Sequence, residues 1–150
     1  MIERIIQVDE RLIHALRTRG MDYFNEAKLP GTFKVDTFLS SWSSILAAGY
    51  GAMWRYQSGT DIAGLMGAII APDLNDAEVT ATEMFLYVLP EYRERGFGIR
   101  LINNFISWAR DIGATRIMMA HVLGDQNAFI DHFTQRGFVQ AGVILVKELT

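Results

Sequence analysis

The chain has 150 residues, half of them apolar and 21% charged, and this composition predicts one globular domain over residues 1–150. Its formal charge of −3 lacks the basic excess on which nucleic-acid binding depends, and the absence of cysteine excludes disulfides, thiolate metal sites and a cysteine nucleophile. The first ten residues interrupt short apolar pairs with charges, unlike a secretory leader, so we expect a cytoplasmic protein.

An uncharged run over residues 37–54 approaches the length of a membrane span. It contains four serines and a Gly-Tyr-Gly break, which favour a buried helix followed by a strand. We therefore expect no membrane partner.

Hydrophobic periodicity divides the first half of the chain into two helical regions and a hairpin. The spacing of apolar residues over 8–24 predicts one helix or two short ones, and an apolar stripe over 38–46 predicts a second helix ending near Gly49. Residues 52–57 and 62–71 then form two strands joined by the turn Ser58-Gly59-Thr60-Asp61.

The second half alternates strands with helices. Residues 78–89 form a strand that Pro90 ends, and a helix over 98–112 ends at Gly113. A strand over 116–123, a short helix over 126–135, and one long strand or a tight pair over 138–149 complete the order. Helix crossovers between the later strands favour local parallel pairing, so the fold class is a mixed α/β (α+β) sheet covered by helices.

Residues 85–101 carry the clearest chemical signal, because a strand runs through a turn into a helix that opens with Gly96 and Gly98. The first N–H groups of a helix lack intrahelical partners and carry partial positive charge, so they bind anions. Arg93, Arg95 and Arg100 add full charges nearby. A lone Gly-x-Gly is also typical of an ordinary strand-to-helix turn. The third glycine of a dinucleotide site and the Gly-Lys-Ser/Thr of a phosphate-binding loop are both missing.

The segment resembles the acetyl-CoA signature of the GNAT acetyltransferase superfamily, Gln/Arg-x-x-Gly-x-Gly/Ala, at Arg93, Gly96 and Gly98. Its phrasing also resembles short chains of this type encoded in phage genomes. Further agreement with the family falls at Val88, Pro90, Tyr92, Leu101, Gly113-Ala114, Gly137-Phe138 and residues 147–149.

The resemblance implies a twisted, mostly antiparallel sheet of six to seven strands flanked by about four helices, with parallel pairing at central strands 4 and 5. It implies acetyl-CoA as co-substrate, with pantetheine bound like an added strand and pyrophosphate held by loop amides. No His and carboxylate pair has metal-ligand spacing, so no metal is expected. The cofactor-binding residues implied are Leu86, Tyr87, Val88, Arg93, Glu94, Arg95, Gly96, Phe97, Gly98, Ile99, Arg100, Asn127 and Phe133. For Arg100 a structural explanation is equally good, namely a charged side chain on the solvent-exposed side of the helix.

The resemblance further implies direct transfer of an acetyl group to a primary amine of a small molecule or a protein. The family's tyrosine acid falls on Phe133, which cannot donate a proton. Catalytic candidates are Glu83 as base, with His121 and His132. In a regular strand Glu83 shares a face with Phe85 and Tyr87, but the family often carries a bulge here, which would move it.

These candidates also have structural explanations: a solvated strand carboxylate for Glu83, a hydrogen-bonded core residue for His121 and a surface residue for His132. By analogy the acceptor pocket is framed by the first two helices, whose aromatic residues are otherwise core: Phe24, Phe33, Phe38 and Trp42. The alternative function is a CoA-binding or non-catalytic structural or regulatory protein, which Phe133 favours. Family members are often dimers, so the resemblance also implies a homodimer.

Overall fold

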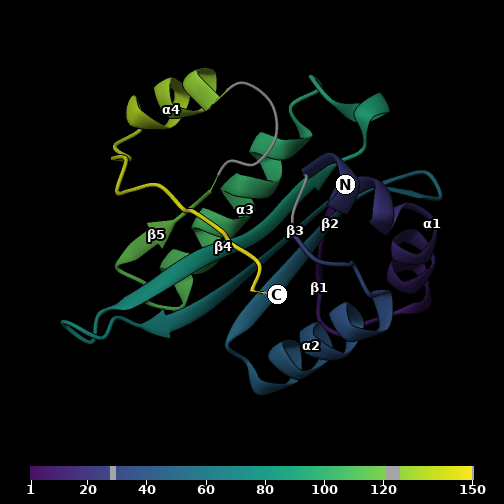
Figure 1. The fold of residues 1–150 in the computed structure, drawn as a ribbon, viewed down its shortest axis with the longest axis horizontal. Coiled ribbons are helices and arrows are strands. Elements are labelled where there is room, and N and C mark those ends of the chain that lie inside the picture. Colours follow the sequence, from purple (N-terminus) through teal and green to yellow (C-terminus); the bar gives the residue numbers. More distant parts are fainter. Residues whose placement is uncertain (28–29, 121–125, 150) are drawn as a thin grey trace.

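The structure is a computed structural model that describes residues 1–27, 30–120 and 126–149. Figure 1 shows one twisted sheet in the order β1-β2-β3-β4-β5. Neighbouring strands are antiparallel except for the parallel pair β4 and β5, which confirms the predicted mixed sheet and its parallel pairing. The described residues form five strands, fewer than the six to seven expected: β1 (Ile2–Ile5), β2 (Gly51–Ser58), β3 (Asp61–Pro72), β4 (Val79–Val88) and β5 (Arg116–Met118).

Helices cover both faces of this sheet (Figure 1). On one face lie α1 (Glu10–Ala27) and α2 (Val35–Ala48), and on the other lie α3 (Phe97–Asp111) and α4 (Gln126–Thr134). The apolar stripe of each helix therefore packs on the sheet, and the two faces of the sheet carry separate hydrophobic cores. The core under α3 contains Trp54, Phe105 and Trp108, whereas Trp42 and Phe85 belong to the core under α1 and α2.

Helix α1 is a single helix that passes through Gly20. A Cβ at this position would lie 2.7 Å from Cε1 of Phe33, so the glycine lets the Phe33 ring approach the helix. The predicted hairpin is also present, with Ser58 paired to Asp61 at its end. None of the helices within the described ranges combines the length and apolar character that a membrane crossing requires.

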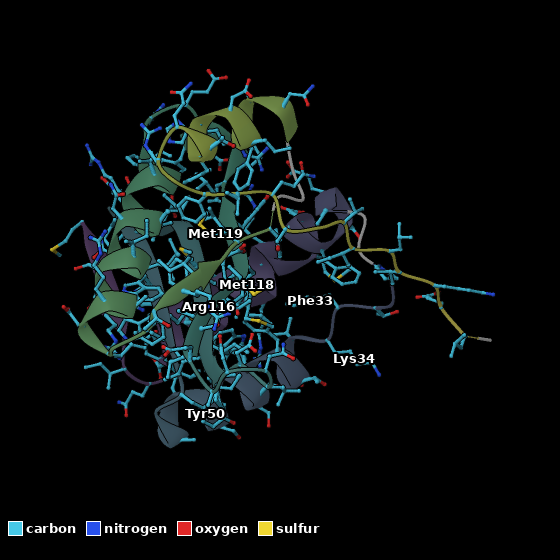
Figure 2. All side chains as sticks on the ribbon, turned by 90° about the vertical axis from the view of Figure 1, so that its left-hand side faces the viewer. Phe33, Lys34, Tyr50, Arg116, Met118 and Met119 are labelled. Atoms are coloured by element: carbon cyan, nitrogen blue, oxygen red, sulfur yellow. The ribbon has the colours of Figure 1, made fainter. Side chains whose placement is uncertain are left out.

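One strand was missed, and one strand prediction was wrong. Residues 2–5 form β1, which the short charged sequence did not reveal. Residues 138–149 form no strand, and Val143 to Val146 stay 68–91% exposed. The reason is that β-branched residues favour a strand only where a partner edge is available, and the sequence does not specify that partner. The strand predicted over 116–123 ends at Met118, which is exposed at the side of the molecule that Figure 2 faces; positions 121–123 lie outside the described residues.

A bulge interrupts β4. Gly67 of β3 pairs with Phe85, but the next residue, Ala68, pairs with Glu83, so Met84 has no partner. The side chains after Met84 consequently exchange faces. Phe85 packs in the core under α1 and α2, while Glu83 faces the α3 side, so its predicted sharing of a face with Phe85 and Tyr87 was wrong.

Candidate active site

Half of β4 has an edge that no described strand covers. β4 pairs with β3 from Val79 to Val88, but with β5 only from Thr80 to Thr82. The Leu89 N–H donates to the carbonyl of Ala63 in β3, so by strand alternation the N–H and C=O of Leu86 and the N–H of Val88 point the other way. These groups offer the hydrogen bonds of a missing strand to an extended ligand.

The open edge leads to the N-terminus of α3. Gly96 caps this helix with φ of 77°, a left-handed conformation that glycine adopts without strain, and no side chain caps the helix end. Gly98 is different: a Cβ there would meet only Val88 Cγ2, at 3.8 Å. Packing within the protein therefore does not require glycine at position 98, whereas close approach of an anion to the backbone would.

Together the β4 edge and the α3 N-terminus border a cavity of about 420 Å³, which we call the β4–α3 groove. The groove gathers ten residues singled out in the sequence: Glu83, Leu86, Val88, Arg93, Glu94, Gly96, Phe97, Gly98, Ile99 and Phe133. The groove therefore contains most of the residues implied to bind the cofactor, together with one catalytic candidate, Glu83.

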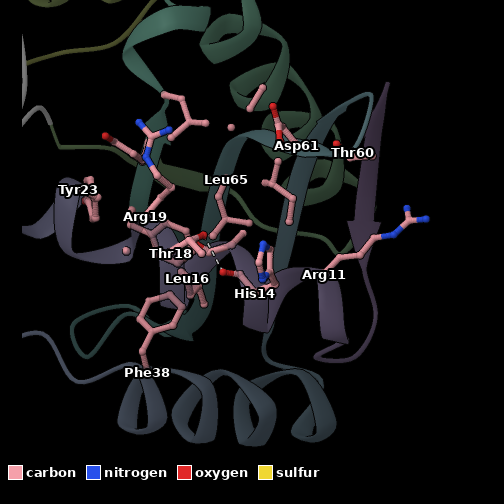
Figure 3. Close-up of a pocket in the computed structure, with 18 of the residues that line it drawn as sticks. Arg11, His14, Leu16, Thr18, Arg19, Tyr23, Phe38, Thr60, Asp61 and Leu65 are labelled. Carbon is pink, nitrogen blue, oxygen red and sulfur yellow. Dashed lines mark hydrogen bonds between the residues drawn. The ribbon is translucent and has the colours of Figure 1, made fainter.

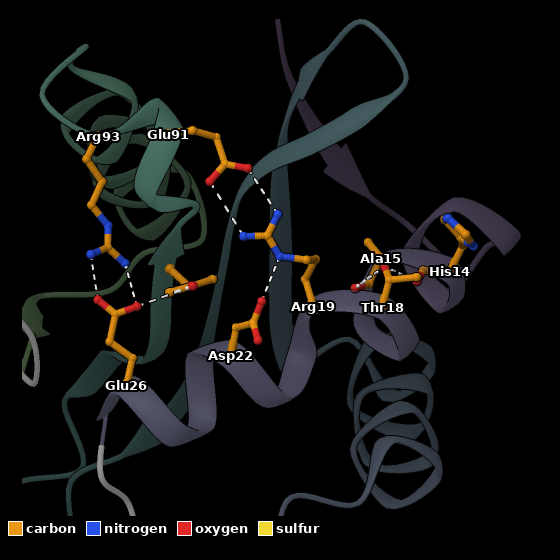
Figure 4. Close-up of polar contacts among 9 residues, drawn as sticks. His14, Ala15, Thr18, Arg19, Asp22, Glu26, Glu91 and Arg93 are labelled. Atoms are coloured by element: carbon orange, nitrogen blue, oxygen red, sulfur yellow. Dashed lines mark hydrogen bonds and ion pairs between the residues drawn. The ribbon is translucent and has the colours of Figure 1, made fainter.

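Arg93 does not point its charge at the helix N-terminus. Its guanidinium binds the carboxylate of Glu26 in α1 through two hydrogen bonds of 2.5 and 2.9 Å (Figure 4). Its Nε donates to the Val88 carbonyl at 2.9 Å. The Arg93 hydrogen bond is the main reason that the pKa of Glu26 is lowered. Arg93 therefore ties α1 to the loop before α3.

Glu83 is a half-buried carboxylate in the wall of the groove. It accepts a hydrogen bond from the Ala120 N–H at 3.0 Å, which lowers its pKa, but burial outweighs this contact and raises the pKa above its ordinary value. A carboxylate whose pKa is moved toward neutrality is suited to accept a proton from an amine.

Phe133 occupies the place expected for the tyrosine acid. Its ring is 7% exposed, lines the groove and packs on Phe129 with ring centroids 4.7 Å apart. His132 packs against the edge of this ring, and its Nε2 is buried without a hydrogen bond to the described residues. His132 is not among the groove-lining residues, and His121 lies outside the described residues.

The remaining implied residues lie around the groove rather than in its wall. Tyr87 turns its side chain to the opposite face of β4, and Arg95 is exposed above the Tyr92 ring. Arg100 lines a separate shallow hollow beside Met1 and Tyr56, and Asn127 stands exposed in the first turn of α4.

Tyr23 is a groove residue that the sequence did not reveal. Burial, and then the charge of Glu83, raise the pKa of Tyr23 to about 12. In the sequence it is one member of an apolar helical stripe, and no local signal distinguishes it from the core residues of that stripe.

An open strand edge, an uncapped helix N-terminus and a carboxylate with a raised pKa together form a candidate active site for an extended, anionic ligand. The chain belongs to the acetyltransferase (GNAT) family, whose sequence model matches residues 13–138. A comparison with curated proteins found no match.

Solved structures of acetyltransferases share this fold. Glucosamine-6-phosphate N-acetyltransferase from Arabidopsis thaliana is 11% identical with a TM-score of 0.72, over 100% of this chain and 99% of that one. An aminoglycoside acetyltransferase from an uncultured soil metagenomic sample, in complex with sisomicin, is 14% identical with a TM-score of 0.73, over 100% and 96% of the chains. The aminoglycoside N-acetyltransferase AAC(6')-Iy in complex with CoA is 18% identical with a TM-score of 0.70, over 99% and 95%.

Proposed function

We propose that the protein transfers an acetyl group from acetyl-CoA to a primary amine of a small molecule. The observation that carries the proposal is the edge of β4 from Glu83 to Val88, which no strand of the described residues covers and which ends at the uncapped N-terminus of α3. The backbone groups of Leu86 and Val88 would hold pantetheine as an added strand, and the amides around Gly98 would hold pyrophosphate. Relatives described with CoA and with an aminoglycoside support this choice of donor and acceptor.

The chemistry requires a base for the amine. The nitrogen lone pair forms a C–N bond to the thioester carbonyl, the C–S bond breaks, and the sulfur leaves with the bonding electrons. Glu83 accepts the proton that the nitrogen loses, which its raised pKa favours. This proton transfer is the role that we assign to the groove carboxylate.

The departing thiolate needs a hydrogen-bond donor, and Phe133 cannot supply one. The Tyr23 hydroxyl lines the same groove and keeps its proton, because its pKa is about 12. An alkyl thiol has a pKa of about 8.5, well below that of Tyr23, so full proton transfer from Tyr23 to the thiolate is unfavourable. Tyr23 would instead stabilise the thiolate by donating a hydrogen bond, and water would supply the proton.

Titration calorimetry with acetyl-CoA tests the site. We expect Gly98→Glu to weaken binding by at least about 100-fold, because it places a bulky anion where phosphate would approach the amides. Ser107→Glu is the matched control: it adds the same charge to an exposed position of α3, about 13 Å further along the helix, and should leave affinity within about threefold. Absence of acetyl-CoA binding to the unaltered protein would refute the proposal.

Turnover is measured separately, as release of CoA thiol with a panel of primary amines. Acetyl-CoA binding without amine-dependent thiol release would favour the non-catalytic CoA-binding role instead, for which Phe133 is the supporting observation.

Two further properties remain part of the proposal. A cytoplasmic location fits a chain without cysteine. A homodimer fits the resemblance, because members of the family are often dimers. Light scattering would distinguish a monomer of 16.9 kDa from a particle of twice that mass.

A further inference from the structure

A second cavity, of about 570 Å³, lies between α1 and the sheet face that carries Phe85 and Tyr87; we call it the α1 cavity (Figure 3). The α1 residues that line it extend from Glu10 to Tyr23 at helical spacing. At 1.5 Å per residue, the cavity follows the helix for about 20 Å. Figure 3 places Arg11 and Tyr23 at opposite ends. The α1 cavity is therefore long, and larger than the β4–α3 groove.

Most of the wall of the α1 cavity is apolar. The large apolar side chains of the wall come from α1, the segment before α2, α2 itself, β3, β4 and the residue after β4, and they include Leu16, Phe33, Phe38, Leu65, Phe85 and Leu89. Such a wall favours a ligand that can bury hydrocarbon, because apolar surface removed from water stabilises the bound state.

The charged groups along the middle of the α1 cavity are already engaged. The Arg19 guanidinium donates to Asp22 at 2.7 Å and to Glu91 at 3.0 Å (Figure 4), and Asp61 accepts a hydrogen bond from the Tyr92 hydroxyl at 3.2 Å. A phosphorylated ligand would have to break the ion pairs of Arg19 to gain a partner there. The exposed side chains of Glu10, Arg11 and His14 lie near the end away from Tyr23.

Tyr23 connects the α1 cavity to the β4–α3 groove, since it lines both. Its ring packs on Tyr87 with centroids 4.8 Å apart, beside the part of β4 that β5 does not cover. The bulge at Met84 turns Glu83 into the groove and Phe85 into the cavity. A ligand in the α1 cavity can thus reach the groove carboxylate around the open edge of β4.

We infer that the α1 cavity holds the acceptor, and that this acceptor is a primary amine with an elongated apolar body, alkyl or arylalkyl. Its nitrogen lies at the Tyr23 end beside Glu83, and its hydrocarbon lies along α1. This inference rests on the proposed function and specifies the substrate class of that site.

The test is a rate series with acetyl-CoA and n-alkylamines from butylamine to octylamine, together with 4-phenylbutylamine, kanamycin and glucosamine 6-phosphate. Each added methylene should raise kcat/KM about three- to fourfold until the cavity is full, because burial of one CH₂ changes the equilibrium by about that factor. The two sugar amines should react at least about 100-fold more slowly than octylamine, because they lack the hydrocarbon chain that the apolar wall would bury.

Ala15→Phe extends a ring from α1 into the cavity and should lower kcat/KM for octylamine by at least about tenfold. Ala47→Phe is the matched control, because it makes the same change at an exposed position of α2 and should leave the rate within about twofold. Acetyl-CoA affinity, measured by calorimetry, should be the same in both variants and shows that each has folded.

The possible failures are distinguishable. If acetyl-CoA binds and the sugar amines react while alkylamine rates do not depend on chain length, the inference is overturned and the proposed function stands. If acetyl-CoA does not bind, the proposed function fails and the inference fails with it. The chain-length series uses the unaltered protein, so it decides the matter even if Ala15→Phe does not fold.

Discussion

Replacing Glu83 by Gln separates the chemical role of this carboxylate from its structural one. The substitution keeps the side-chain length, and the amide oxygen can still accept the hydrogen bond that Ala120 N–H donates at 3.0 Å. What it removes is the negative charge that burial makes unfavourable. If Glu83 is the base, kcat/KM for an accepted amine should fall about 100-fold or more, the usual contribution of general base catalysis.

The same substitution should stabilise the fold at neutral pH. The pKa of Glu83 is raised in the folded state, so between the unfolded and folded pKa values the folded protein binds more protons, and stability falls as pH rises through that window. Above the window the unaltered protein carries the full cost of the charge, which Gln avoids. The melting temperature of the variant should therefore exceed that of the unaltered protein at pH 7.5, with the difference vanishing below the ordinary glutamate pKa of about 4.3.

Three measurements check this reasoning: the pH profile of kcat/KM, acetyl-CoA affinity and melting temperature across pH. The acidic limb of the rate profile should lie above the ordinary glutamate pKa and disappear in the variant. Glu78→Gln is the matched control, because Glu78 is exposed, precedes β4 and likewise accepts a hydrogen bond, from Thr115 at 2.9 Å. A variant rate within threefold of normal at every pH would refute the base assignment, and a lower melting temperature at pH 7.5 would refute the cost attributed to burial.

Two other predictions concern the acid and the fold. Phe133→Tyr adds the hydroxyl that the resemblance implies at this position, as a second donor beside Tyr23, and should raise kcat about tenfold in a thiol-release assay with acetyl-CoA affinity unchanged. A lower kcat would count against a role for a donor at this position. Arg55→Ala should lower the free energy of unfolding by about 2 kcal/mol in urea titrations, because the buried guanidinium forms ion pairs with Glu3 at 2.9 Å and Asp9 at 2.7 Å. The control Arg95→Ala, at an exposed position, should change this free energy by less than about 0.5 kcal/mol. Partial burial acts to raise the pKa of Asp9, but hydrogen bonds from the Leu12 N–H and Arg55 lower it overall, so its stabilising effect is present at neutral pH and should be lost as pH falls through that lowered pKa.

The turn from β4 into α3 could be predicted from sequence because its physics is local. A strand, a turn with Gly96 and the first turn of a helix occupy fewer than twenty consecutive residues, and each follows from neighbouring residue types. The alternation of apolar residues likewise predicted the hairpin and the amphipathic helices. These features do not depend on a distant part of the chain.

Contacts between distant segments could not be predicted in this way. The Glu26 carboxylate that binds Arg93 comes from α1, 67 residues away, and nothing near either residue indicates the pair. The same limit explains β1, whose strand character depends on β2 opposite Ile2–Ile5, and residues 138–149, whose β-forming composition has no paired edge.

The bulge at Met84 decides which side chains meet which ligand. Gly67, paired with Phe85, has no side chain, and a Cβ there would lie 2.7 Å from both Phe85 Cζ and Trp42 Cη2. The Phe85 ring fills that space and packs edge-on against Trp42 with centroids 5.3 Å apart. This packing favours Phe85 on the α1 face, which leaves Glu83 on the α3 face across the extra residue. The contact of Phe85 with α2 thus places the proposed base and the apolar wall of the α1 cavity on opposite faces of β4. Strict alternation of side chains along β4 would instead have predicted that Glu83 and Phe85 share one face.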